Sequence, residues 1–425
     1  MDANVDLKPT QRIRVAVVSD LHFCNQRPPG GGSELSHIVL QTLHEKNGKN
    51  PWTDLIEMVR HDRIDADFLL CPGDITTHAA HAPLKAAWEG LLDLGRGLGA
   101  RLVACATGNH DVSSRFAEGK TNPVHDLDNP HDLFENLKLL SPDYPVHVYA
   151  EEGDRTNGRK RRVHYFGADF VIHEDESCRL VVFNSCARHI TENSSYERGS
   201  IAKSALAELA EQLKTTSDEK INIFLCHHHP VQHTHDGDGS YDFILRADEL
   251  INFLSDEGDW IIVHGHKHDG RIIYAPHGSP GATPVVFSAS SMGAILSTDR
   301  LNQYRNQFYL VDIELSGTGC SRGTLKVWNW NAGIGWSTAT DPNAGLTDGV
   351  GFGEREHPDT LAQKIAARVK DGSVPWTTLL QEFSFLNNLT PDSLKLLLKS
   401  LKKRHRLTEL RDPTSHRITE IGPEA

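Results

Sequence analysis

The chain has 425 residues, of which 38% are hydrophobic and 24% are charged, and its formal net charge is −13. This length suits two or three domains, and no stretch reaches the roughly 18 consecutive apolar residues that a membrane-spanning helix needs. The acidity disfavours broad attraction to nucleic acid, although it leaves room for a local basic patch. Seven scattered cysteines argue against a disulfide framework, and the polar residues 1–11 lack the apolar core of a secretory signal. We therefore expect a soluble, cytoplasmic protein.

Six continuously apolar runs, rich in β-branched residues, predict strands that are buried on both faces. They are residues 13–18, 66–70, 102–106, 180–184, 221–225 and 260–263. Helical patterns lie between them at 51–61, 82–94 and 201–213. This alternation indicates a layered α/β architecture. Further apolar runs at 284–289, 307–314 and 324–330 are expected to complete a second sheet.

Five short polar motifs follow five of the six runs. They are Asp20-Leu21-His22, Gly73-Asp74, Gly108-Asn109-His110-Asp111, His227-His228-His229-Pro230 and Gly265-His266-Lys267-His268. Ligands of open α/β sheets bind beyond the carboxyl ends of the strands, so we expect these motifs to converge. Each motif alone is typical of a turn, whereas the whole set at strand ends predicts a metal site.

The motifs supply carboxylate, amide and imidazole groups but no thiolate, which suits Mn, Fe or Zn rather than calcium. Asp20 and His22 are two residues apart on a turn and can face one ion, and the two oxygens of Asp74 suit it to bridge two ions. Two ions about 3.5–4 Å apart can clamp a phosphate and activate a hydroxide for in-line attack. His110 is expected to protonate the leaving alkoxide, and Asp111 to cap or orient a neighbouring turn.

With these motifs in order over residues 12–330, the chain resembles the calcineurin-like metallophosphoesterases. It looks most like the class III cyclic nucleotide phosphodiesterases and related small phosphodiesterases, which share D-x-H, GD, GNH[DE], HH-x-P and GH-x-H. The resemblance implies a four-layer α/β-β/α sandwich with two metal ions. The implied ligands are Asp20, His22, Asp74 and His268 for the first ion, and Asp74, Asn109, His228 and His266 for the second. His228 is chosen over its neighbours because the family ligand usually lies two residues before the proline.

Departures from other branches narrow the resemblance. Phosphoprotein phosphatases carry GD-x-x-DRG, but Asp74 is followed here by Ile75-Thr76-Thr77-His78. Purple acid phosphatases place a tyrosine ligand three residues after this aspartate, where this chain has Thr77. Both branches are therefore disfavoured. The DNA-repair nuclease branch is not excluded by the motifs.

The C-terminal part lies outside this resemblance. We expect a metallophosphoesterase domain at 12–335, a linker at 336–357 and a mainly helical module at 358–425, with an irregular polar insertion at 113–162. The module has helical patterns at 360–370 and 391–403 and a possible hairpin of 407–410 with 417–421. One face of the second helix and its end are basic, with Lys395, Lys399, Lys402, Lys403, Arg404 and Arg406. A winged-helix module would bind nucleic acid; the alternative, which we favour, is a cap that binds a partner or another copy.

The sequence thus predicts a dinuclear metal-dependent phosphoesterase, in which a hydroxide held between the ions attacks phosphorus and His110 acts as general acid. The expected substrate is a small phosphodiester such as a cyclic nucleotide. Two alternatives stay open: a nuclease to which the C-terminal module delivers DNA or RNA, and a regulatory protein that binds nucleic acid or protein. No substrate-binding residue and no oligomeric state is predicted.

Overall fold

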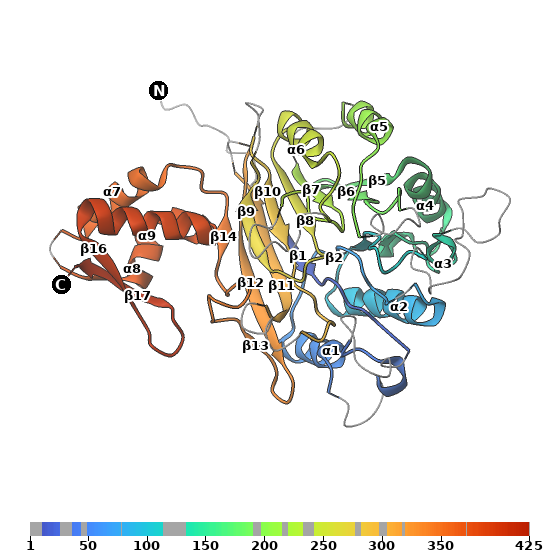
Figure 1. Cartoon of the computed structure of the whole chain (residues 1–425), viewed down its shortest axis with the longest axis horizontal. Helices are drawn as coiled ribbons and strands as arrows, with labels where there is room; N and C mark the ends of the chain where they lie inside the picture. Colours follow the sequence, from blue (N-terminus) through green and yellow to red (C-terminus); the bar gives the residue numbers. More distant parts are fainter. Residues whose placement is uncertain are drawn as a thin grey trace.

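The computed structural model forms a main lobe of two sheets and, beside it, a small C-terminal module (Figure 1). It describes residues 11–25, 36–43, 49–77, 79–113, 133–189, 197–214, 220–232, 242–276, 282–296, 304–316, 319–370 and 372–424. None of the helices among these residues combines the length and the apolar character that a membrane span requires.

The larger sheet of the main lobe has eight strands. Its order is β13 (Gly335–Thr338), β12 (Ser321–Asn331), β11 (Asn306–Leu315), β1 (Arg12–Val17), β2 (Phe68–Cys71), β3 (Leu102–Cys105) and β4 (Val146–Val148), with β14 (Gly351–Phe352) paired to β12. β1, β2 and β3 run parallel, while β11 is antiparallel to β1. The three parallel strands therefore end at the same edge.

The smaller sheet has six strands, again with a parallel centre. Its order is β5 (Phe170–Glu174), β6 (Cys178–Phe183), β7 (Ile221–Leu225), β8 (Trp260–His264), β10 (Val285–Ser288) and β9 (Arg271–Tyr274). β6, β7, β8 and β10 are parallel, and the edge strands β5 and β9 are antiparallel. The central strands are buried along their whole length, as their continuous hydrophobicity predicts.

Helices cover the outer faces of both sheets, which gives the expected four layers. α1 (Pro51–Asp62) and α2 (His81–Gly97) pack on the larger sheet, and α5 (Lys203–Leu213) and α6 (Ala247–Asp256) on the smaller one. α1 starts at Asn50, whose side chain accepts hydrogen bonds from the backbone of Trp52 and Thr53, both at 3.0 Å. The α/β-β/α sandwich is thus confirmed. Cys71, Cys105 and Cys226 are buried free thiols within it.

Two expectations about the connections need correction. β10 joins the smaller sheet, but β11 and β12 join the larger one, because β11 pairs with β1 from Arg12 to Val17. The stretch 336–357, expected as a linker, contributes β14 and most of β13 to the larger sheet. Within the expected insertion at 113–162, the described residues form α3 (Glu135–Lys138), β4, a short 3-10 helix (Tyr149–Glu151) and the start of α4 (Thr156–Ala168). The domain boundaries themselves stay a prediction.

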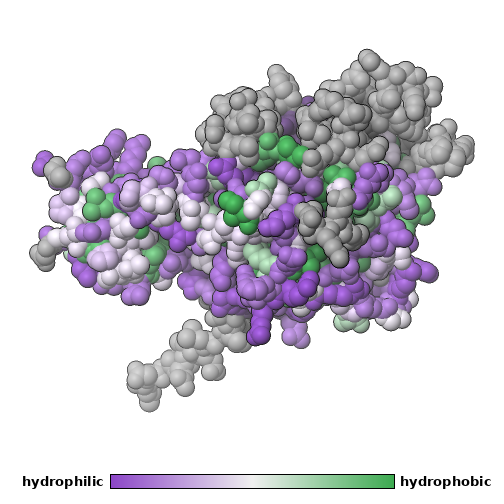
Figure 2. Space-filling model, turned by 90° about the horizontal axis from the view of Figure 1, so that it is seen from below, coloured by the Kyte–Doolittle hydropathy of each residue, from purple (hydrophilic) through white to green (hydrophobic). Residues whose placement is uncertain are grey.

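The C-terminal module has its own hydrophobic core and stands off the main lobe as a separate lobe (Figure 2). It contains α7 (Pro358–Arg368), β15 (Val374–Pro375), α8 (Trp376–Glu382), α9 (Pro391–His405), β16 (Leu407–Arg411) and β17 (Ile418–Pro423). The expected helices and hairpin are confirmed. α9 buries Leu397, Leu398 and Leu401, and Thr390 caps its N-terminal end, with its hydroxyl accepting from Ser393 N at 3.2 Å.

The connection to the module runs along β9, the edge strand of the smaller sheet. Tyr274 of β9 donates its hydroxyl to Glu354 O and accepts from Gly353 N, both at 2.9 Å. Arg355 lies over the Tyr274 ring and forms an ion pair with Asp259. The connecting residues 353–355 therefore lie against the edge strand of the smaller sheet, just before the chain enters the module.

Candidate metal centre

The expected ligand residues gather at the carboxyl ends of the parallel strands, in two neighbouring clusters that share Asp74. In the first cluster, His268 Nε2 lies 3.2 Å from His22 Nε2 and 3.4 Å from Asp20 Oδ1. A carboxylate oxygen of Asp74 lies within 4.8 Å of a ring nitrogen of His22. All of these residues except His268 are almost completely buried.

The second cluster forms on the other side of Asp74. Asn109 Oδ1 lies 3.0 Å from His227 Nε2 and 3.1 Å from His266 Nδ1. His227 Nε2 is also 3.3 Å from Asp74 Oδ2 and 3.2 Å from His266 Nδ1. Two imidazoles, an amide oxygen and a carboxylate oxygen thus face one another.

The spacing of these atoms fits metal coordination. Atoms held about 2.1 Å from one ion are about 3.0 Å apart in an octahedral arrangement and about 3.4 Å apart in a tetrahedral one. The distances of 3.0–3.4 Å within the clusters fall in this range. The donor set contains no thiolate and mixes nitrogen with oxygen, so it suits Mn, Fe or Zn.

The structure differs from the sequence analysis at the triple histidine. His227, rather than His228, points its Nε2 into the second cluster, and its Nδ1 is fixed by the carbonyl of Pro72 at 2.8 Å. His228 turns its Nδ1 to Ser185 Oγ at 2.8 Å, and its Nε2 has no hydrogen-bond partner among the described residues. His227 therefore lies beside Asn109, where we expected His228, and His228 also brings a ligand atom within 4.8 Å of those of His227 and His266. A count back from Pro230 cannot reveal this orientation.

The backbone is strained where these residues lie. Eleven described residues other than glycine have a positive φ, and five of them are Asp20, His22, Asp74, His266 and His268, with φ of 49° to 80°. Such conformations cost about 1–3 kcal/mol each and concentrate at functional sites. The loop conformations thus cost stability, and they position the ligand side chains.

Glycines let the ligand loops approach each other. A Cβ on Gly108 would lie 2.1 Å from Asp74 Oδ1, and a Cβ on Gly265 would lie 2.5 Å from Asp20 Oδ2. Gly73 has a φ of +101° and packs against the backbone of Gly108. These glycines explain why three of the motifs begin with this residue.

Burial and mutual charge set the protonation of the cluster without metal. Burial lowers the pKa of both His22 and His266 to about 3. Burial alone would raise the pKa of Asp74, but the charges of His227 and His110 hold it well below its ordinary value. Burial would likewise lower the pKa of His227, yet the charge of Asp74 raises it to about 9. A proton on His227 therefore occupies the position that a cation would take.

His110 and Asp111, which follow Asn109, have different surroundings. His110 packs its ring edge on His22 at 4.9 Å, and its Nε2 lies 4.0 Å from Asp74 Oδ2. Asp111 accepts hydrogen bonds from Thr76 N at 3.0 Å and Gly108 N at 2.9 Å, which confirms that it orients neighbouring turns. Burial, and after it the charge of Asp74, raise the pKa of Asp111 to about 8.

The sequence analysis missed Asp242, which lies behind the second cluster. Its Oδ2 is 3.6 Å from His266 Nε2, the nitrogen that points away from Asn109, and it forms an ion pair with Lys267. This separation is longer than a hydrogen bond, so Asp242 lies beside the imidazole without fixing its orientation. Asp242 follows no apolar run, so no signal in the sequence connects it with the motifs.

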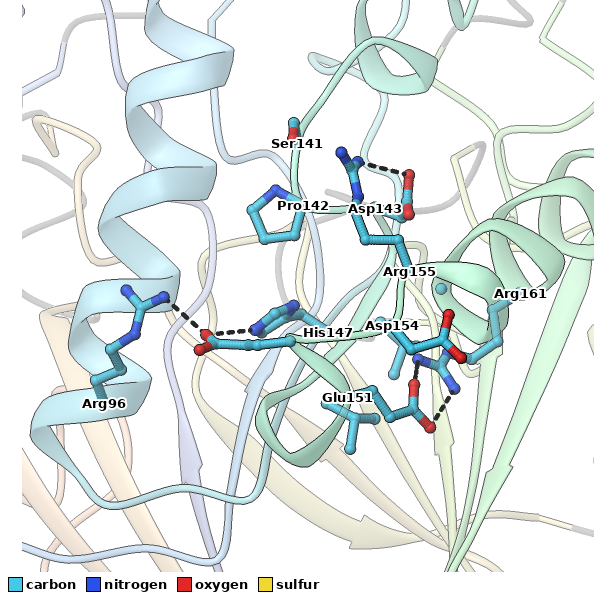
Figure 3. A pocket seen from close by; sticks show the side chains of 13 residues that line it. Arg96, Ser141, Pro142, Asp143, His147, Glu151, Asp154, Arg155 and Arg161 are labelled. Carbon is cyan, nitrogen blue, oxygen red and sulfur yellow. Dashed lines mark hydrogen bonds and ion pairs between the residues drawn. The ribbon is translucent and has the colours of Figure 1, made fainter.

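A pocket of about 290 Å³ elsewhere in the main lobe offers a contrast (Figure 3). It lies between α2 and α4, and its charged side chains pair with each other. Arg96 and His147 both contact Glu152, at 2.9 and 3.2 Å, and Arg161 pairs with Glu151. Because its charges are compensated internally, we do not assign this pocket to the reaction.

Comparison with solved structures gives distant similarities. The chain is similar to a purple acid phosphatase from yellow lupin (Lupinus luteus) seeds, with 14% identity, a TM-score of 0.42 and coverage of 76% of this chain and 52% of that chain. It is also similar to phosphopantetheinyl hydrolase from Mycobacterium tuberculosis, with 11% identity, a TM-score of 0.31 and coverage of 65% and 89%. The chain spans about half the length of the lupin enzyme. No curated protein matches it.

Two family models match different parts of the sequence. Residues 350–403 match the winged helix-turn-helix model described as wHTH-Calcineurin_assc. Residues 13–270, more than half of the chain, match the model of the calcineurin-like phosphoesterases and include all five motifs. The chain therefore belongs to the calcineurin-like phosphoesterase family.

Proposed function

We propose that this phosphoesterase hydrolyses a phosphodiester with the help of two divalent ions, Mn, Fe or Zn. The observation that carries the proposal is the position of Asp74 between two clusters of ligand atoms. One of its oxygens lies 3.3 Å from His227 Nε2, and the carboxylate also approaches His22 in the first cluster. A shared carboxylate is the arrangement by which proteins hold two ions close together.

We assign the ligands from the atoms that face each other in each cluster. The first ion would be held by Asp20, His22, Asp74 and His268, and the second by Asp74, Asn109, His227 and His266. Ions bound there would polarise a phosphoryl oxygen and lower the pKa of a water molecule. The protein contributes by fixing the ligands, and the positive φ angles and glycine contacts support this role.

His110 is the proposed proton donor to the leaving oxygen. Its backbone N–H donates to Asp74 Oδ1 at 2.8 Å, which ties the residue to the proposed bridging carboxylate. Its side chain is 11% exposed, so it reaches the surface of the site while remaining next to the clusters. A histidine in such a position can hold a proton for the departing alkoxide.

A diester substrate is supported by what this chain has in place of the residues of other branches. At the position where purple acid phosphatases have a tyrosine ligand, the Thr77 hydroxyl lies 3.4 Å from the carbonyl of His22 and donates to it. The DRG motif of phosphoprotein phosphatases is also missing from the sequence. The motifs favour the class III cyclic nucleotide phosphodiesterases and related small phosphodiesterases, and we propose activity of that kind.

Duplex nucleic acid is a less favoured substrate because of how α9 lies. Recognition helices of helix-turn-helix modules place their N-terminal residues in the major groove. Here Pro391, Asp392 and Lys395, at the N-terminal end of α9, line a cavity of about 480 Å³ shared with β9. The end of α9 that would enter a major groove therefore lies beside the main lobe, and the cavity there has the volume of a small-molecule site.

The proposal is tested with the Mn²⁺-loaded full-length protein and a panel of substrates. The panel contains bis(p-nitrophenyl) phosphate, p-nitrophenyl phosphate, a cyclic nucleotide and single-stranded DNA, and Asn109→Ala serves as the control variant. We expect kcat/KM for the diester to exceed that for the monoester at least about tenfold, and little turnover by Asn109→Ala. Failure to hydrolyse any substrate while metal analysis finds two ions per chain would overturn the proposal.

A further inference from the structure

A second cavity lies close to the metal centre, where the C-terminal module meets the main lobe. Its volume is about 480 Å³, within the range of small-molecule sites, and interfaces between domains are common places for such sites. Four segments line it: the start of β9 with the two residues before it, Tyr304 just before β11, the loop 342–346 after β13, and the N-terminal end of α9. In Figure 1, one end of α9 lies against the sheet beside β9.

The cavity lies at the same edge of the smaller sheet as the metal centre. Its lining begins with Asp269, the residue directly after His268. Arg271, at the start of β9, pairs with Ser288 of β10, which in turn pairs with His264 at the end of β8. Two strand spacings, about 10 Å, therefore separate Arg271 from the end of β8. This is a distance that one nucleotide can span.

Hydrogen bonds connect the wall of the cavity to the metal centre. Ser290 donates its hydroxyl to His268 O and its N–H to the hydroxyl of Tyr309, both at 2.9 Å. Tyr309 donates to Gln307 Oε1 at 2.8 Å, and the same oxygen accepts from Leu346 N at 3.1 Å. Loop 342–346 is thus positioned relative to a proposed metal ligand by a chain of buried polar groups.

The polar groups of the walls are of mixed kind. Arg271 makes no ion pair with any residue that the structure describes, and Lys395 contacts only Asp392 in the described part of the chain, at 3.5 Å. Both side chains can donate charge-assisted hydrogen bonds to hydroxyl and carbonyl oxygens. Asp269 and Asn343 offer acceptors for hydroxyl and amino groups, and Tyr304 offers an aromatic ring. Sugar hydroxyls and an aromatic base with carbonyl or amino groups occur together in a nucleoside.

We propose that this interface cavity binds the nucleoside part of a nucleotide diester whose phosphate lies at the metal centre. The inference rests on the proposed phosphodiesterase function and extends it. It gives the C-terminal module a role in substrate selection, because Lys395 belongs to α9 and Arg271 to the main lobe. The module then acts as a wall of the substrate site.

Two substrates with the same leaving group test the proposal. The Mn²⁺-loaded full-length protein is assayed with thymidine 5′-(p-nitrophenyl phosphate) and with bis(p-nitrophenyl) phosphate, and the ratio of the two kcat/KM values is measured. Arg271→Gln and Lys395→Ala should each lower this ratio about tenfold, since each removes a charged donor. Lys399→Ala is the matched control, because Lys399 is one turn further along α9 and does not line the cavity.

The outcomes separate this proposal from the one on which it rests. If the metal-loaded wild type hydrolyses neither diester, the phosphodiesterase function is wrong. If it hydrolyses both but the ratio stays within about twofold in Arg271→Gln and Lys395→Ala, the cavity does not hold the nucleoside, while the phosphodiesterase function stands. Lys395 is 77% exposed, so its replacement removes no core packing and the full chain should fold.

Discussion

The metal centre and the pocket between α2 and α4 both gather polar and ionisable side chains, but they combine them in opposite ways. In the pocket, Arg96 and His147 surround Glu152, and Arg161 pairs with Glu151. In the metal centre, Asp74 faces His227 and the ring nitrogens of His22 and His268 face each other at 3.2 Å. In the pocket, cationic and anionic side chains form ion pairs with each other, whereas the metal centre brings together atoms that all can donate electron pairs to a cation.

The difference also appears in the backbone. None of the described residues that line the pocket, apart from glycine, has a positive φ, while five residues of the metal centre do. Ion pairs between flexible side chains need no special backbone, but ligands at fixed distances from an ion do. A high density of charged side chains is therefore a poor guide to a catalytic site. Ligand atoms that face one another, on residues with a strained backbone, are a better guide.

The largest effect should come from the bridging carboxylate. Asp74→Asn should lower kcat/KM for bis(p-nitrophenyl) phosphate at least about 1,000-fold and reduce the metal bound per chain, because both clusters lose a charged ligand. Steady-state kinetics and elemental analysis measure the two effects. Glu152→Gln in the pocket is the control. Its kcat/KM and metal content should stay near those of wild type, because the Arg96–Glu152 ion pair is about half exposed to solvent. Equal losses in both variants would remove the distinction between the two regions.

A smaller effect is expected at His110, which is beside the clusters but not among the facing ligand atoms. His110→Asn should lower kcat about 100-fold for a diester with an alkoxide leaving group, and much less for p-nitrophenolate, which leaves without a proton. The metal content should remain that of wild type. Loss of metal together with activity would instead make His110 a ligand, and an equal loss on both leaving groups would exclude its role as the acid.

Most of the fold could be predicted because the buried strands are continuous apolar runs. The run 221–225 coincides with β7, and the other five overlap their strands to within two residues. The sheet to which the later strands belong could not be predicted, since an apolar run does not specify its partner. β11 reaches β1 across almost 300 residues of chain, and only the three-dimensional pairing reveals it.

The site could be predicted from residue types at strand ends, but not the direction of each side chain. Asp20, His22, Asp74, Asn109, His266 and His268 lie in the two clusters, as their places after the strands suggested. Among three consecutive histidines, the choice of His228 over His227 was not supported, because it depends on the rotation of the chain after β7. Asp242, which lies beside His266, was missed since it belongs to no motif.

The stability gained from metal binding should also distinguish variants of the metal centre from variants of the pocket. Mn²⁺ at about 100 times its Kd should raise the free energy of unfolding by about 2.7 kcal/mol for each bound ion, measured by denaturant titration with and without chelator. Arg161→Met in the pocket should be less stable by about 1–3 kcal/mol but retain the full increment from metal, because its ion pair with Glu151 is independent of the clusters. Asp74→Asn should lose the increment. An increment that vanishes in Arg161→Met would couple the regions.

The smallest effect is the release of a proton when metal binds. Without metal, Asp74 raises the pKa of His227 to about 9, so at pH 7.5 the ring carries a proton that a cation must displace. That protonation stabilises the metal-free protein at low pH and is lost as pH rises through 9, so apparent metal affinity should increase with pH up to about 9. Calorimetry in buffers of different ionisation enthalpy counts the protons released when metal binds.

The two histidine variants should differ in this count. His227→Asn should release about one proton fewer than wild type on binding metal. His228→Asn should release the same number as wild type, because burial already keeps His228 neutral by lowering its pKa. The reverse result would restore His228 as the ligand and place His227 among the supporting residues.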